Sequence, residues 1–249
     1  MMKKTGKSST AIVVTLIIVI GAIIFGLIIT NFLGSKSASD TITVSGNSQI
    51  EVSPDLVSIY YNIQTTGKTS QEAKDKNSEI VENVKIGLIS QGFEKKEIQT
   101  INFNIYPEYE YPSGRIKLYN AIHSLILKFS TEDIDKIGSA IDAGVNGGAT
   151  INSINFELTP ENQNKYKAEA IKFAAEDARM KAESLVEGLN KKLGKLVSVT
   201  DNSFGYSPWI LYEGRADAVS ADEAKAAVTD IQPNQRTISA SVTVVYKIV

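Results

Sequence analysis

An uncharged apolar segment near the start of the chain most constrains what it can fold into. Residues 11–33 read AIVVTLIIVIGAIIFGLIITNFL and contain no Asp, Glu, Lys or Arg. A helix of this length extends about 35 Å, and the hydrocarbon core of a bilayer is about 30 Å thick. The sequence therefore predicts a single N-terminal transmembrane helix.

The charges on either side of this segment predict its orientation. Three lysines lie within residues 1–10, whereas the polar linker at 34–40 contains one. The positive-inside rule then places the N-terminus in the cytoplasm and residues 41–249 outside it. The alternative is a cleaved signal peptide, because residues 37–39 (Ser-Ala-Ser) resemble a cleavage site, although signal h-regions typically have about 7–15 residues. We expect a retained single-pass anchor in the cell membrane, and either alternative exports the domain.

The composition of the exported part excludes several kinds of site. The chain has no cysteine, and His123 is its only histidine. Disulfides, thiolate metal sites, cysteine nucleophiles and paired-imidazole sites in one chain are thus excluded. Four of the 26 basic residues precede Asp40, so 22 remain against 28 acidic ones. This balance argues against binding to nucleic acid or anionic lipid, and we expect no cofactor and no metal.

Hydrophobic periodicity predicts alternating strands and helices after the linker. A proline-aspartate turn at 53–55 predicts that the first two strands form a hairpin, and the first of them should break at 45–47. Strands are expected at 41–52, 56–63, 98–105, 116–129, 151–158, 196–199 and 237–248. Helices are expected from Thr69 to Gly92, at 131–143 and at 159–190, the last beginning with a Thr-Pro-Glu start signal.

The long helix repeats alanine at every fourth position, at Ala170, Ala174, Ala178 and Ala182. Such a shallow ridge lets another backbone approach closely. One interpretation is packing of the helix on a sheet of the same chain. The other is contact between helices of two chains, which would make the protein a homo-oligomer.

Four tyrosines fall on the predicted hairpin of strands 98–105 and 116–129. They are Tyr106, Tyr109, Tyr111 and Tyr119. Tyrosine is favoured at recognition surfaces because it offers a large area with a polar end. The sequence predicts a contact patch for a second subunit or a ligand, with cross-strand packing inside the hairpin as the alternative.

Two carboxylates, Glu108 and Glu110, flank Tyr109 in the same loop. In an extended backbone they would point the same way, about 7 Å apart, as a glycosidase pair or a hard-cation site requires. The alternative is a solvated acidic turn, since no third ligand or acid is evident. His123, in the middle of a strand, is expected to be a sheet or core residue.

Residues 201–235 form a long, mostly polar excursion that contains Gly205, Pro208, Gly214 and Pro233. Long loops of this kind are usually functional or disordered. Trp209 stands near its start, together with Tyr206 and Tyr212. We expect this segment either to dock a partner through Trp209 or to fold back on its own domain.

The order of local patterns across residues 41–249 resembles the SIMPL-domain family, which includes periplasmic immunogenic proteins of bacteria. The patterns are Val44-Ser45-Gly46, Val52-Ser53-Pro54-Asp55, Thr69/Ala73/Asn77, Gly92, Gln99-Thr100, the segment 106–111, Leu118-Tyr119-Asn120-Ala121, Gly147-Gly148, Ile154-Asn155-Phe156, the alanine-rich helix and the closing strand 239–244. The resemblance implies an α+β domain in which helices cover one side of an antiparallel sheet. It also implies an envelope protein linked to stress tolerance, sometimes assembled into rings, with no agreed catalytic residues.

These observations lead to one functional hypothesis and two alternatives. We expect a membrane-anchored, extracytoplasmic assembly or binding module that is not an enzyme. A receptor or substrate-binding subunit that grips a small ligand through the Trp209 segment is one alternative. A hydrolase that uses Glu108 and Glu110 is the other.

Overall fold

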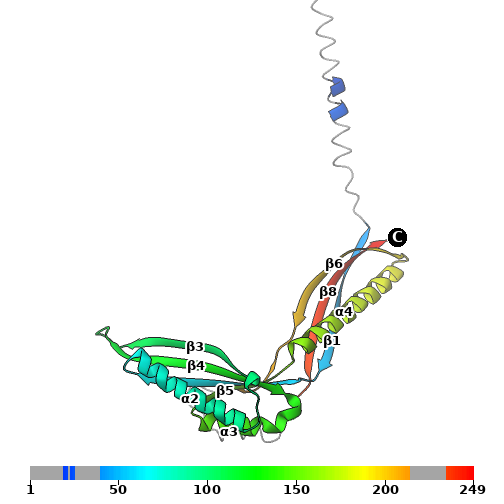
Figure 1. Ribbon diagram of the computed structural model, residues 1–249. Helices are drawn as coiled ribbons and strands as arrows, with labels where there is room; N and C mark the ends of the chain where they lie inside the picture. The colour runs from blue at the N-terminus through cyan, green and yellow to red at the C-terminus, as the bar shows by residue number, and fades with distance from the viewer. Residues whose placement is uncertain (1–18, 22, 26–39, 214–233) are drawn as a thin grey trace, which may run out of the picture. The chain divides into compact units, whose positions relative to one another are not determined.

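The computed structural model describes residues 19–21, 23–25, 40–213 and 234–249 (Figure 1). The elements are β1 (Thr41–Val52), β2 (Leu56–Gly67), α2 (Ser70–Ser90), the short 3-10 helix η1 (Lys95–Glu97), β3 (Ile98–Tyr109), β4 (Ile116–Ser130), the 3-10 helix η2 (Thr131–Lys136), α3 (Ile137–Asn146), β5 (Thr150–Glu157), α4 (Pro160–Gly188), β6 (Leu193–Gly205), β7 (Trp209–Glu213) and β8 (Arg236–Ile248). One sheet has the strand order β1-β8-β6 and the other β3-β4-β2-β5-β7. The predicted α+β class is confirmed.

The apolar segment at 11–33 lies largely outside the described residues. Its described parts, 19–21 and 23–25, are helical, and their apolar side chains are exposed. Within the part of the chain that the structure describes, no helix combines the length and the apolar character needed to cross a membrane.

The prediction that β1 and β2 form a hairpin is wrong. β1 runs unbroken through residues 45–47 and belongs to the three-stranded sheet, whereas β2 pairs with β4 and β5 in the other sheet. The turn between them bonds to other elements, because the Asp55 amide donates to the Glu157 carbonyl and the Thr131 amide donates to the Asp55 carbonyl. The turn therefore connects two sheets.

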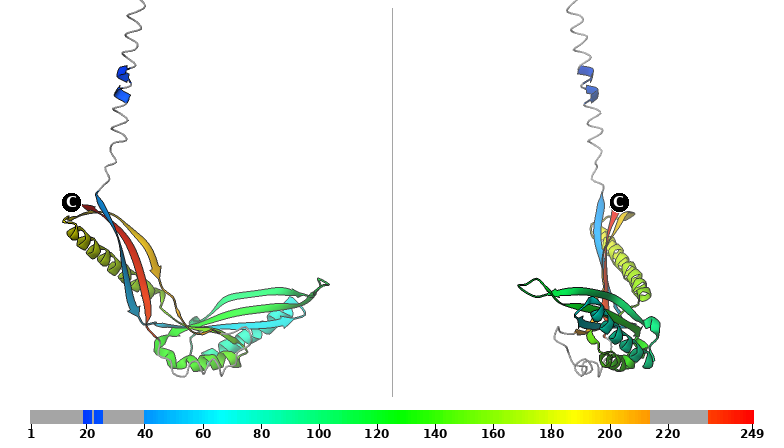
Figure 2. Two further views of the ribbon diagram at one scale, coloured as in Figure 1. Left: turned by 180° about the vertical axis from the view of Figure 1, so that it is seen from behind. Right: turned by 60° about the vertical axis from the view of Figure 1, so that its left-hand side comes forward.

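Helices α2 and α3 cover one face of the five-stranded sheet (Figure 2), as predicted for the helices of this domain. α2 begins after Thr69, whose side chain accepts a hydrogen bond from the Glu72 amide, and Gly92 follows it with a φ of 87°. Both ends confirm the predicted start and stop signals. The predicted helix at 131–143 is the 3-10 helix η2 followed by α3.

The four alanines of α4 are fully buried within a single chain. α4 lies along the strands β1 and β8 (Figures 1 and 2), and the Ser48 hydroxyl donates to the Ala170 carbonyl at 2.6 Å. The first interpretation of the alanine ridge, helix on sheet in one chain, is therefore confirmed. The small side chains let the helix backbone approach the strands.

The excursion after residue 200 contains more strand than predicted. β6 extends to Gly205, and β7 pairs antiparallel with β5. Residues 214–233, most of its polar part, lie outside the described residues. The described residues group into two compact units: those within 1–45, 178–200 and 243–249 form unit 1, and those within 46–177 and 201–242 form unit 2.

Candidate functional site

The hairpin of β3 and β4 ends in a tight turn that exposes two of the four tyrosines. Tyr109 is 60% exposed and Tyr111 is 96% exposed. The turn is closed by the Glu110 amide, which donates to the Arg115 carbonyl at 2.8 Å, and by the Gly114 amide, which donates to the Glu110 carbonyl at 2.9 Å. Gly114 has a φ of 66°, which only glycine adopts freely.

The strand register divides the predicted tyrosine patch between two faces of the hairpin. Tyr106 stands opposite Asn120, and Tyr119 stands opposite Pro107. Residues directly opposite in an antiparallel pair share a face, and successive residues alternate. Tyr106 and Tyr119 therefore lie on opposite faces. Tyr106 is 39% exposed, and Tyr109 and Tyr111 at the turn are more exposed still.

The two carboxylates of the hairpin are engaged with their neighbours. Glu108 accepts hydrogen bonds from the Lys117 ammonium at 2.9 Å and from the Asn120 amide at 3.4 Å, and these bonds lower the pKa of Glu108. Glu110 accepts one from the Ser113 hydroxyl at 3.1 Å. A general acid of a glycosidase needs a raised pKa. The arrangement fits the predicted solvated turn.

His123 lies at the centre of β4, opposite Phe103 on β3. Its Nε2 is 2.9 Å from the Thr100 hydroxyl, and its ring centroid is 5.1 Å from that of Phe103. Partial burial lowers the pKa of His123, and the charge of Lys85 adds to the effect. His123 is thus a sheet residue, as expected. In the described ranges no three His, Asp or Glu side chains gather as a metal site would need.

Trp209 packs on its own domain. Its ring stacks on Phe156 at a centroid distance of 5.1 Å and an interplanar angle of 22°, against the core of the five-stranded sheet. The nearby Tyr206 hydroxyl accepts a hydrogen bond from the Leu158 amide at 2.7 Å. The start of the excursion folds back on β5, and Trp209 is partly buried there.

A polar cluster that the sequence did not indicate surrounds Asp55. One Asp55 carboxylate oxygen accepts from the Thr159 amide at 2.7 Å, and the other accepts from the Thr159 hydroxyl at 2.7 Å and the Asn162 amide group at 2.5 Å. Partial burial raises the pKa of Asp55, but these hydrogen bonds outweigh it and leave the pKa below its usual value. The two local signals, a turn at Asp55 and a helix start at Thr159, are visible in the sequence. Their contact across the fold is not.

The neighbouring titratable groups are also paired. The Tyr60 hydroxyl donates to Glu157 at 3.4 Å, and burial together with the Glu157 charge raises the pKa of Tyr60. A neutral phenol beside a carboxylate stabilises the fold but is not an activated nucleophile. The Asp55 cluster joins the start of β2, the end of β5 and the start of α4.

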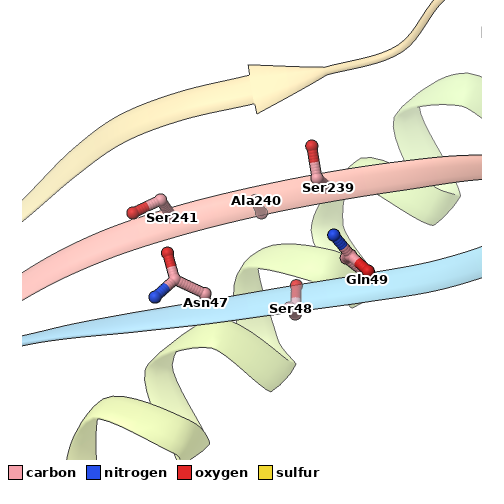
Figure 3. A pocket seen from close by; sticks show the side chains of 6 residues that line it. All are labelled: Asn47, Ser48, Gln49, Ser239, Ala240 and Ser241. Carbon is pink, nitrogen blue, oxygen red and sulfur yellow. The ribbon is translucent and has the colours of Figure 1, made fainter.

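An open pocket of about 510 Å³ lies on β1 and β8 (Figure 3). Asn47 and Gln49 of β1 and Ser239 and Ser241 of β8 surround it, and Ser48 and Ala240 complete its lining. The backbone N–H of Asn47 donates to the Asp177 carboxylate of α4 at 2.8 Å, which fixes this part of β1. The lining offers amide and hydroxyl groups and no titratable side chain, so the pocket is suited to hydrogen bonding and not to acid-base chemistry.

Comparison with known proteins finds a family model that matches most of this chain. The family model SIMPL, described as a protein of unknown function (DUF541), matches residues 42–246. The 26 kDa periplasmic immunogenic protein of Brucella melitensis biotype 1 is 27% identical over 218 residues, which cover 83% of this chain and 84% of that protein. The uncharacterized protein YggE of Escherichia coli K12 is 27% identical over 170 residues, which cover 67% of this chain and 68% of that protein.

Proposed function

We propose, since this chain belongs to the SIMPL family, that it is a membrane-tethered extracytoplasmic module that works by assembly or binding and not by catalysis. The observation that supports this most directly is that the carboxylates considered above are hydrogen-bonded within the fold. Asp55, Glu108 and Glu110 all accept hydrogen bonds within the fold. We therefore assign Glu108 and Glu110 a structural role in the turn, which disfavours the hydrolase alternative.

Two observations support the location. The relative from Brucella is named a periplasmic protein, and residues 11–33 are uncharged and long enough to cross a bilayer. The described parts of this segment are helical with exposed apolar side chains, as expected of a helix whose surroundings are lipid. We propose that residues 11–33 anchor the chain, that residues 1–10 stay in the cytoplasm, and that 41–249 form the exported SIMPL domain.

The exposed aromatic turn supports assembly. Tyr109 and Tyr111 present large side chains at the end of a hairpin, where no other described element covers them. Tyrosine at such a position contributes contact area at low entropic cost. We propose that this turn contacts a second copy of the chain.

The test is the oligomeric state of the full chain in detergent, measured by light scattering over a range of concentrations. The unaltered chain should self-associate, and Tyr109→Ser with Tyr111→Ser should shift the association to higher concentration. The matched control, Tyr109→Phe with Tyr111→Phe, keeps the ring area and should associate nearly as well. A strictly monomeric unaltered chain, or equal association of the serine variant, would contradict the assembly proposal.

The pocket on β1 and β8 favours a second candidate, a receptor for a polar ligand. Its amide and hydroxyl side chains point to a sugar or an extended peptide, which such groups bind through hydrogen bonds. Chito-oligosaccharides, measured by titration calorimetry with the full chain, are a suitable probe. Binding that Gln49→Ala with Ser241→Ala removes would support this candidate. Absence of heat with the unaltered chain would count against it as a sugar receptor.

A further inference from the structure

Three segments of unit 1 meet at one of its ends, which we call the tip. They are Asp40 before β1, the turn 189–192 between α4 and β6, and residues 247–249 at the end of β8. Figures 1 and 2 show the start of β1, the end of β8 and the end of α4 at this common end.

Backbone hydrogen bonds hold the tip together. The Lys192 amide donates to the Val249 carbonyl at 2.7 Å, and the Val249 amide donates back to the Lys192 carbonyl at 2.9 Å. The Ile248 amide donates to the Asp40 carbonyl at 2.7 Å. Asn190 turns the chain with a φ of 55°, and the Lys191 amide donates to the Val186 carbonyl at 2.8 Å. The tip is therefore a fixed surface rather than a loose loop.

The exposed side chains of the tip are mostly basic or apolar, with Asp40 and Asn190 as the exceptions. Lys191, Lys192 and Lys247 are exposed, and none of them has an ion-pair partner among the described residues. Leu189 is 63% exposed and Val249 is 68% exposed. Exposed apolar side chains together with lysines are typical of surfaces that bind at the lipid headgroup boundary. There the apolar side chains enter the lipid and the lysine stems reach toward phosphates.

The net negative charge of residues 40–249 predicts repulsion from anionic lipid, but this holds only for the exported part as a whole. Salt screens charges beyond about 8–10 Å, so a surface responds to the charges near it. Asp40 is the only acidic residue among the tip segments, against three lysines. The charge at the tip is thus opposite in sign to the average.

The connection to the apolar segment limits how far the tip can move from the membrane. Six residues, 34–39, separate residue 33 from Asp40, and an extended chain spans at most about 3.6 Å per residue. The start of β1 is thus within about 25 Å of the end of the segment.

We infer that the tip docks on the phosphate-bearing surface of the bilayer that holds residues 11–33. Leu189 enters the headgroup boundary, and Lys191, Lys192 and Lys247 bind the phosphates of anionic lipids, whose charge no choline balances. This inference depends on the proposed anchor, and it adds a second, electrostatic contact that orients unit 1 at the membrane.

The absence of cysteine permits a direct test with single spin labels in the full chain. The chain is placed in nanodiscs of equal parts phosphatidylglycerol and phosphatidylcholine, with Ile20→Cys, Leu189→Cys or Tyr111→Cys labelled in turn. Accessibility to oxygen and to a water-soluble nickel complex gives the depth of each label. We expect the label at 20 to be buried in lipid, the label at 189 to be shielded from nickel, and the label at 111 to be open to nickel.

Charge variants test whether docking of the tip depends on the negatively charged phosphates of the lipid headgroups. Lys191→Glu with Lys192→Glu should raise the nickel accessibility of the label at 189 severalfold, as should discs of phosphatidylcholine alone. The matched control, Lys74→Glu with Lys95→Glu on unit 2, should leave it unchanged. Circular dichroism of each variant checks that the fold is retained.

The outcomes separate this inference from the anchor on which it depends. A label at 189 that is as open to nickel as the label at 111, while the label at 20 is buried, overturns the docking and leaves the anchor standing. A label at 20 that is open to nickel overturns both. Shielding at 189 that survives both charge reversal and discs of phosphatidylcholine alone overturns the role of anionic lipid headgroups.

Discussion

The carboxylate of Asp55 accepts hydrogen bonds from both the amide and the hydroxyl of Thr159, each at 2.7 Å, across 104 residues of sequence. Thr159 is also the residue whose hydroxyl accepts from the Asn162 amide at 3.4 Å at the start of α4. One carboxylate thus fixes the turn before β2 to the first turn of the longest helix. An anionic side chain near a helix N-terminus is further stabilised by the helix dipole.

Replacing Asp55 with Asn should lower the free energy of unfolding by about 1–2 kcal/mol at neutral pH. Hydrogen bonds to a charged group contribute about 1.5–3 kcal/mol, and partial exposure reduces this value. Folding lowers the pKa of Asp55 from 3.8. The stabilisation that the charged carboxylate gives is therefore complete above that pH, and it is lost as pH falls through the folded-state pKa. Asp55→Asn should not show this loss of stability at low pH, because it has no carboxylate to protonate. Denaturant unfolding in detergent at pH 7 and near pH 3 measures both effects.

The control for this prediction is Glu79→Gln on the exposed surface of α2. Its free energy of unfolding should stay within about 0.5 kcal/mol of the unaltered chain. Equal acid sensitivity of the Asn variant and the unaltered chain would show that Asp55 does not act through its charge.

Gly144 of α3 leaves room for the ring of Tyr61. A Cβ atom at this position would lie 2.2 Å from a ring carbon of Tyr61, whose hydroxyl donates to the Ala140 carbonyl at 3.0 Å. Tyr61 is fully buried and cannot move aside. Gly144→Ala should therefore lower the free energy of unfolding by about 1–3 kcal/mol through overpacking.

Gly138, on the same helix, is the matched control for this substitution. No atom lies within 4 Å of a Cβ built at Gly138. Because alanine favours helix over glycine, Gly138→Ala should be neutral or stabilising by up to about 1 kcal/mol. Thermal unfolding of both variants decides the point, and a Gly144 variant as stable as the Gly138 variant would contradict the close packing.

Asn77 attaches α2 to two strands at once. Its amide group is fully buried and donates to the Ile63 carbonyl of β2 at 3.1 Å and to the Ala121 carbonyl of β4 at 3.3 Å. Asn77→Ala should cost about 1–3 kcal/mol, because it removes both bonds and leaves a small cavity. Ser78→Ala, at the exposed neighbouring position, should change little. Hydrogen exchange should show faster opening of α2 in the Asn77 variant alone.

Local signals predicted the elements of this fold well, and contacts between distant residues were predicted poorly. The helix cap at Thr69 and the start at Thr159 depend on neighbours within four residues, so the sequence contains them in full. The hairpin of β3 and β4 was predicted for the same reason. The supposed hairpin of β1 and β2 failed because a Pro-Asp turn is compatible with both a hairpin and a connection between sheets, and only the distant partner Glu157 decides between them.

In the candidate site, too, local features could be predicted and contacts between distant residues could not. The exposure of Tyr109 and Tyr111 could be predicted because turn residues face solvent. The division of Tyr106 from Tyr119 depends on cross-strand register, in which one residue of shift moves a side chain to the other face. The pocket on β1 and β8 joins residues from the two ends of the domain, and no spacing in the sequence indicates such a meeting.

Trp209 is the chain's only tryptophan, so its fluorescence reports on one place in the fold. Because its ring stacks on Phe156 at 5.1 Å, its emission should be blue-shifted in the folded chain and should move to longer wavelength on unfolding. Trp209→Ala should cost about 2 kcal/mol, less than a fully buried tryptophan, since the ring is only partly buried. Trp209→Phe should retain most of the stability by keeping an aromatic ring on Phe156. Denaturant unfolding followed by circular dichroism measures both variants. An alanine variant as stable as the unaltered chain would show that Trp209 is not needed for packing and would restore its predicted role as a docking residue.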